Sequence, residues 1–134
     1  MKLNDFDFRV WDGNQKQYVK NNIILAMLGR HRELVNINND IARNTMFDVI
    51  NSDKAEIELY TRLKDKNGKK IYEGDIVKFK EPTIFEVCFE YSIFSLRYKK
   101  NEFYELLNEY DESTIEVIGN IHENPALLQT SQNE

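Results

Sequence analysis

The thiol of Cys88 and the imidazole of His122 are the side chains of this sequence most suited to nucleophilic chemistry. A cysteine beside a histidine can act as nucleophile and base, because the thiolate is the attacking species. Glu86 and Glu90 flank Cys88 along the chain, and their negative charges oppose ionisation of a thiol. We therefore expect Cys88 to be a covered or interfacial thiol without a catalytic role.

Carboxylates offer a second kind of chemistry. Glu73 and Asp75 flank Gly74 and would suit a cation or acid–base catalysis if they were held at a defined separation. A Glu-Gly-Asp turn that opens a strand explains the same residues without a site. His122 and Glu123 are adjacent, and adjacent residues of a strand point to opposite faces, which favours a surface histidine over a metal ligand. We predict no catalytic residue, no metal site and no cofactor.

Positive charge is concentrated between residues 62 and 80, which hold seven basic and three acidic residues, whereas residues 81–134 hold eleven acidic and three basic ones. Such lysines, with Tyr72 or Phe79 for base stacking, would suit a nucleic acid. The net charge of −5 disfavours general nucleic-acid binding. A solvated hairpin, which we call the basic hairpin (residues 62–80), is the preferred interpretation, and nucleic-acid binding is an alternative.

An enzyme alternative comes from the Gly-Asp-Ile-Val sequence at residues 74–77, which is similar to a strand start in small barrels of toxin ribonucleases. Such a barrel needs a basic residue and an acid that converge on RNA. Arg97 and Glu86 are the candidates, although the sequence gives no reason for them to meet. Because phosphate-binding glycine loops, metal-ligand clusters and triad patterns are absent from the sequence, we expect a protein that is not an enzyme.

Strict alternation of apolar and polar residues predicts antiparallel strands over most of the chain. The residues expected to face inward are Phe6, Phe8, Val10, Ile57, Leu59, Phe85, Val87, Phe89, Phe94, Leu96 and Tyr98. Five or six short strands between residues 57 and 121, with turns about every ten residues, favour a small antiparallel barrel or a strongly bent sheet.

Turn residues mark the borders of these strands. Asn67-Gly68 favours a two-residue hairpin of type I′, because both residues tolerate positive φ. Glu73-Gly74-Asp75 predicts a second turn, and Asn124-Pro125 predicts the start of a short helical turn followed by a frayed tail.

The segment 30–53 gives a poor signal. Leu34, Ile37 and Ile41 have helical spacing, and Val35 with Ile37 also fits a short strand. The asparagines between residues 36 and 44 are weak helix formers: Asn36, Asn38, Asn39 and Asn44. The prediction is a strand in the first part and a short helix near residues 41–48.

Three blocks of the sequence together resemble one known family. They are residues 8–12 (FRVWD), residues 63–77 (LKDKNGKKIYEGDIV) and residues 117–125 (VIGNIHENP). The chain is similar in this way to the YopX family, small proteins of bacterial phages and prophages. The resemblance covers residues 8–19 and 62–128, and it implies a C-terminal barrel of SH3-like type without implying any chemistry. The family usually has a glycine where this chain has Arg62, so the local backbone there is expected to differ.

The predicted fold is therefore mainly β (α+β), with antiparallel strands, a C-terminal small SH3-like barrel and a less regular N-terminal lobe. The predicted domains are an N-terminal lobe with a short helix at 1–58, the barrel at 59–124, and a short helical turn and tail at 125–134. Apolar residues on the nominally outward strand faces imply that the N-terminal lobe or another subunit covers them. The predicted interaction surface consists of Lys66, Lys69, Lys70, Ile76, Cys88, Ile93 and Ile118.

Composition sets the remaining expectations. The longest apolar run, residues 23–28, is far shorter than the roughly 20 residues of a membrane span. The N-terminus has acidic residues where a signal peptide needs an apolar core. A single cysteine excludes an internal disulfide and fits a reducing compartment. We expect a cytoplasmic protein of a bacterial host cell that binds itself as a homo-oligomer, or binds another protein, and does not bind membranes.

Overall fold

The structure is a computed structural model that describes residues 1–20, 22–38, 46–50, 53–79, 83–98 and 103–132. The chain forms two compact units. One contains residues 9–58, and the other contains residues 1–8 together with residues 59–134. The segment Met1–Phe8 therefore belongs with the C-terminal part of the chain, while the predicted domain limits stay a prediction.

Residues 9–58 contain a three-stranded antiparallel sheet in the order β3-β4-β5. Its strands are β3 (Asn22–Leu28), β4 (His31–Asn38) and β5 (Met46–Val49). The helix predicted near residues 41–48 is wrong for residues 46–48, because β5 pairs with β4 along its whole length. Cross-strand pairing outweighs the helical spacing of the apolar residues, and residues 41–45 lie outside the described residues.

A second sheet has the order β2-β1-β6-β7, with β1 (Phe8–Asp12), β2 (Gln17–Tyr18), β6 (Ala55–Lys64) and β7 (Lys70–Tyr72). Strand β6 contains a bulge, because the register with β7 shifts between Tyr60 and Lys64. Arg62 lies in this bulge with a φ of 71°, a backbone conformation that residues other than glycine seldom adopt.

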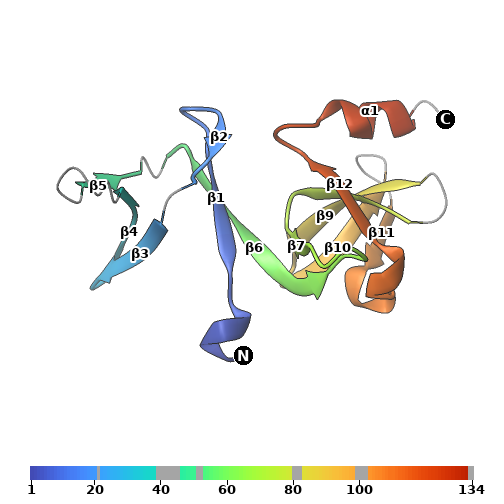
Figure 1. Cartoon of the computed structure of the whole chain (residues 1–134), viewed down its shortest axis with the longest axis horizontal. Coiled ribbons are helices and arrows are strands. Elements are labelled where there is room, and N and C mark those ends of the chain that lie inside the picture. Colours follow the sequence, from blue (N-terminus) through green and yellow to red (C-terminus); the bar gives the residue numbers. More distant parts are fainter. Residues whose placement is uncertain (21, 39–45, 51–52, 80–82, 99–102, 133–134) are drawn as a thin grey trace. The chain divides into compact units, whose positions relative to one another are not determined.

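The third sheet is antiparallel and five-stranded, in the order β11-β10-β9-β8-β12, and its strands curl (Figure 1). It packs around an apolar core. Its strands are β8 (Asp75–Lys78), β9 (Ile84–Glu90), β10 (Ile93–Tyr98), β11 (Phe103–Leu106) and β12 (Glu116–Asn120). The core residues are Ile71, Val77, Phe85, Val87, Leu96, Leu107 and Ile115. The predicted mainly β, antiparallel fold is confirmed, and the SH3-like assignment stays a prediction.

Helical segments among the described residues are short. They are the 3₁₀ helices η1 (Leu3–Asp5), η2 (Leu107–Glu109) and η3 (Glu112–Thr114), and one α-helix, α1 (Ala126–Gln132). The helical turn predicted after Asn124-Pro125 is longer than expected, because α1 continues to Gln132, while the frayed tail stays a prediction. Helix α1 contacts β9.

The hairpin at Asn67-Gly68 differs from the predicted two-residue type I′ turn. Only Gly68 has positive φ, the Gly68 N–H donates to the Asp65 carbonyl, and the Asp65 N–H donates to the Lys69 carbonyl. This is the pattern of a three-residue loop closed by glycine in a bulge. The Asp65 carboxylate selects it, because it accepts hydrogen bonds from the N–H groups of Asn67 and Lys69 at 2.9 Å and of Val117 at 3.0 Å.

The type I′ turn occurs instead in the β9–β10 hairpin. Glu90 pairs with Ile93, so the loop has two residues, Tyr91 and Ser92. Their φ values are 54° and 63°, the positive values that a type I′ turn requires. Neither residue is a glycine or asparagine, so the sequence pattern did not reveal this turn.

Candidate interaction site

The unit formed by residues 1–8 and 59–134 has an open groove with mainly apolar walls and a volume of about 270 Å³. Its apolar lining is Met1, Phe6, Leu59, Tyr60, Phe89 and Phe94, and its charged lining is Asp5, Asp7 and Arg62. We call this site the aromatic groove. Its volume can accept one large apolar side chain with its neighbouring backbone.

Two elements supply the phenylalanines of the aromatic groove. Phe89 and Phe94 face each other across the β9–β10 hairpin, with ring centroids 4.7 Å apart. Phe6 follows η1, and its ring lies 5.8 Å from that of Phe8. Tyr91, in the turn of the hairpin, is almost fully exposed, and the half-exposed Ile93 lies on the opposite face of β10 from Phe94.

Phe6, Ile57 and Phe89 are residues at which the alternation pattern fails. All three were predicted to face inward, but Phe6 is 42% exposed, Ile57 is 41% exposed and Phe89 is 36% exposed. The inward neighbours Val10 and Val87 are buried as predicted. Phe6 and Phe89 line one groove, and a contiguous exposed apolar surface is typical of interaction sites, which is the signal that sequence reasoning missed.

Polar contacts hold the N-terminal wall of the aromatic groove against β7. The Asp7 carboxylate accepts hydrogen bonds from Lys70 Nζ at 2.8 Å and from the Tyr72 hydroxyl at 2.6 Å. Lys70 also lies over the ring of Tyr60, 5.0 Å from its centroid. Partial burial raises the pKa of Asp7, but the bonds from Lys70, Tyr72 and the Phe8 N–H outweigh this effect and lower it overall. The wall is thus fixed by Asp7 in its ionised form.

A second, more polar pocket of about 250 Å³ lies between the basic hairpin and η3. Lys66 and Lys78 line it, and both pair with the carboxylate of Glu116, at 3.1 and 3.4 Å. These hydrogen bonds lower the pKa of Glu116, so it stays ionised and offsets part of the positive charge of the two lysines. The pocket therefore has less positive charge than its lysines suggest.

The structure brings Arg97 and Glu86 together, which the sequence did not predict. Arg97 donates to a carboxylate oxygen of Glu86 at 2.6 Å, and the Cys88 thiol donates to the same oxygen at 3.1 Å. Burial, followed by the bond to Glu86, raises the pKa of the Cys88 thiol far above its ordinary value. Cys88 is therefore held as a neutral thiol, as a buried structural cysteine is.

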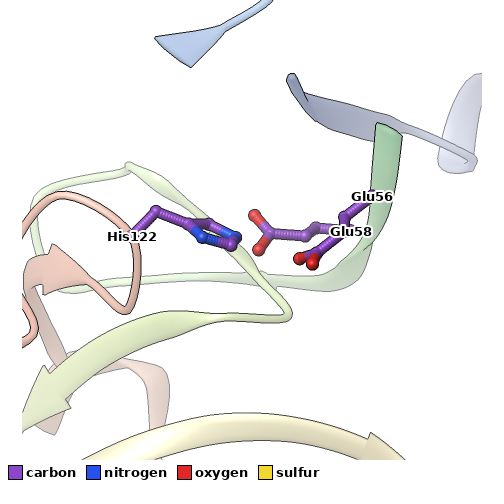
Figure 2. A group of neighbouring side chains, drawn as sticks. All are labelled: Glu56, Glu58 and His122. Carbon is purple, nitrogen blue, oxygen red and sulfur yellow. The ribbon is translucent and has the colours of Figure 1, made fainter. Parts of the chain in front are cut away.

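Glu56 and Glu58 project from β6 in the unit of residues 9–58, whereas His122 follows β12 in the other unit (Figure 2). Glu58 accepts hydrogen bonds from the Arg9 guanidinium at 2.7 Å and from the Tyr18 hydroxyl at 2.8 Å. These contacts assign Glu58 a structural role in the packing of β1 and β2 on β6.

The residues of the predicted interaction surface do not all lie at the surface. Ile76 and Cys88 are buried within the single chain, which removes them from any binding surface and corrects the prediction. Their apolar pattern reflected burial inside the chain and did not require a second subunit. Lys66, Lys69, Lys70 and Ile93 are exposed, and Ile118 is partly buried. Whether these exposed residues bind a partner stays a prediction.

The fold and the aromatic groove define a small antiparallel β-sheet protein of two units, one of which has an open, mainly apolar groove. The chain belongs to the YopX family, whose model, described as "YopX protein", matches residues 7–129. The prediction from the three sequence blocks is confirmed.

Two solved structures are similar over nearly the whole chain. Protein yopX from Bacillus subtilis has 26% sequence identity and a TM-score of 0.62, with 90% of this chain and 96% of that chain covered. Protein EF1440 from Enterococcus faecalis has 25% identity and a TM-score of 0.61, with 92% and 97% covered. No curated protein matches the chain. Among the described residues, no helix has the length and apolar character needed to cross a bilayer.

Proposed function

We propose that this YopX-type protein is a non-enzymatic interaction module that binds a segment of another protein in the aromatic groove. The observation that supports the proposal is the exposure of Phe6 and Phe89, which line one groove although their positions in the sequence fit a core. The occupant would be an extended segment with one aromatic or aliphatic anchor. Burying such a side chain contributes about 1.5–3 kcal/mol.

The groove also has features of a pre-formed site. The ion pair and hydrogen bonds of Asp7 hold one wall, and the β9–β10 hairpin forms another. A wall that is already ordered loses little conformational entropy on binding, which favours affinity. We place this activity in the cytoplasm of a bacterial host cell that carries phage or prophage genes, in keeping with a buried, unpaired Cys88.

A displayed library of random peptides tests this proposal, because it samples many candidate segments in one selection. Peptides selected on the wild-type chain are expected to share an aromatic or aliphatic anchor. Their affinity is expected to fall at least 10-fold, or about 1.4 kcal/mol, for Phe6→Glu and for Phe89→Glu. Circular dichroism of each variant checks that the fold is kept.

Ile57→Glu is the matched control, because Ile57 is 41% exposed, as Phe6 is at 42%, and belongs to the other unit. Its binding is expected to match that of the wild type. Selection of peptides without an apolar anchor, or equal loss of binding in the Ile57→Glu control, would overturn the proposal.

The alternative is a nucleic-acid-binding or nuclease-like barrel. We rank it lower because Lys66, Lys70 and Lys78 each have a carboxylate partner in the same unit. Arg97 and Glu86 pair with each other, so each offsets the charge that the other would offer to RNA. Binding of single-stranded RNA at low salt that is lost in a Lys69→Glu/Lys70→Glu variant would reverse this ranking.

A further inference from the structure

Strand β3 is an edge of its sheet. It pairs with β4 along all seven residues, from Asn22 opposite Ile37 to Leu28 opposite His31. In the described part of the chain no strand pairs with its other side. That side has a row of backbone N–H and C=O groups able to pair with a further strand.

The composition of β3 is unusual for an edge strand. Its sequence, NIILAML, has no charged residue and no proline. Natural sheets protect their edges with charge, proline or short length. The edge strands of the other sheets follow this rule. Strand β2 has only two residues, and the others each contain a charged residue: Lys70 in β7, Glu105 in β11 and Glu116 in β12. Strand β5, the opposite edge of the sheet that contains β3, has Asp48.

The exposure of two paired leucines differs between the edge strand β3 and its neighbour β4. Leu25 of β3 lies opposite Leu34 of β4, so both side chains are on the same face of the sheet. Leu34 has Leu25 on one side and accepts a backbone hydrogen bond from Ile50, the residue after β5, on the other; it is 7% exposed, whereas Leu25 is 40% exposed. A further strand with an apolar residue beside Leu25 would give it the surroundings that Leu34 already has.

We infer that the missing strand is β3 of a second copy of this chain, paired antiparallel to the first about a two-fold axis near Leu25. In an isologous contact the same surface of each copy meets, so β3 of one copy pairs with β3 of the other. The partner strand is then uncharged and apolar, as β3 itself is. The two sheets become one six-stranded sheet. This interface lies within residues 9–58 and is separate from the aromatic groove.

Light scattering across a dilution series tests the interface. The wild-type chain is expected to have twice its mass of 16.0 kDa at the higher concentrations, and Leu25→Lys is expected to have a mass of 16.0 kDa throughout. Lysine at an exposed edge position blocks strand addition and is tolerated by the fold. Ile57→Lys is the control for an equally exposed apolar residue, and it is expected to keep the wild-type mass.

A cross-link gives a second readout that does not depend on a loss of association. Directly opposed residues of antiparallel strands have Cα atoms about 4.5–5.5 Å apart, within reach of a disulfide. Leu25→Cys is expected to form a covalent dimer on mild oxidation, and Ile57→Cys is not; the native thiol of Cys88 is buried.

A wild-type chain of 16.0 kDa at every concentration would overturn the inference, and so would a dimer that Leu25→Lys leaves intact. Phe6→Glu is expected to keep the dimer, so failure of this interface and failure of the aromatic groove give different results.

Discussion

The backbone of Arg62 supports a prediction about stability that its side-chain contacts do not reveal. Arg62 lies in the β6 bulge with a φ of 71°, in the region where a Cβ atom crowds the following carbonyl. The resemblance to the YopX family led us to expect a glycine at this position in relatives and a different local backbone with arginine. Arg62 has a φ that favours glycine, so the strain of that conformation falls on a residue with a Cβ atom.

We predict that Arg62→Gly is more stable than Arg62→Ala by about 1 kcal/mol. Relief of the left-handed conformation contributes roughly 1–2 kcal/mol, and the extra freedom of glycine in the unfolded chain removes about 0.4–1 kcal/mol of that gain. Both variants lose the contact of Arg62 with Asp5, which is 3.8 Å long between exposed side chains. That contact is worth at most about 1 kcal/mol, and it cancels in the comparison.

Chemical denaturation followed by circular dichroism measures the difference directly, and a shift in Tm of about 3–5 °C is expected alongside it. Equal stability of the glycine and alanine variants would refute the reasoning, because relief of the backbone strain is the only contribution that favours the glycine variant. Equal stability would mean that the left-handed conformation in the bulge costs the alanine variant no free energy.

Three further predictions concern a turn, a carboxylate and a thiol. The double variant Tyr91→Asn/Ser92→Gly is expected to raise the free energy of unfolding by about 1 kcal/mol, since Asn-Gly suits positive φ at both positions; unchanged denaturation midpoints would contradict this. Asp65→Ala is expected to lower the free energy of unfolding by about 3 kcal/mol, because three backbone N–H groups lose their acceptor. Burial raises the pKa of Asp65, but these hydrogen bonds lower the pKa overall from 3.8. The contribution of the Asp65 carboxylate to stability is therefore present above pH 3.8 and is lost as the pH falls through the lower pKa of the folded state. Acid unfolding that is identical in wild type and Asp65→Ala would refute this assignment. Cys88 is expected to react with a thiol reagent only after unfolding in guanidinium chloride, because burial raises its pKa; rapid reaction in the native state would contradict the assignment.

Much of the β-sheet structure could be predicted from alternation, because period-2 patterning follows from the geometry of the strand. Val10, Val87 and Leu96 are buried where the pattern placed them. The turn at Glu73-Gly74-Asp75 is also present, with Gly74 at a φ of 86°. In these segments local preference and burial agree, and the sequence alone is sufficient.

Tertiary contacts decide the remaining segments, and the local sequence does not contain them. The Asp65 carboxylate, which accepts hydrogen bonds within the loop at Asn67-Gly68, also accepts one from the N–H of Val117, which is distant in the chain. Residues 46–49 form a strand because β4 is available to pair with them. Contacts of this kind cannot be read from spacing or propensity.

The candidate site could be predicted only in part for a related reason. Alternation assigns Phe6 and Phe89 to the core, and only the folded chain shows that the core closes without them. The predicted surface instead included Ile76 and Cys88, whose apolar character reflects burial on the second face of a sheet. Apolar residues have the same pattern in a covered face and in an interface, so the sequence does not separate the two cases.

The most direct test of the interaction proposal is a titration of ¹⁵N-labelled protein with the tightest peptide selected on it, followed by amide chemical shifts. Binding in the aromatic groove predicts the largest shifts at Phe6, Leu59, Phe89 and Phe94, with Ile57 unaffected. Shifts centred instead on the polar pocket of Lys66, Lys78 and Glu116 would contradict it and move the binding activity to the basic hairpin.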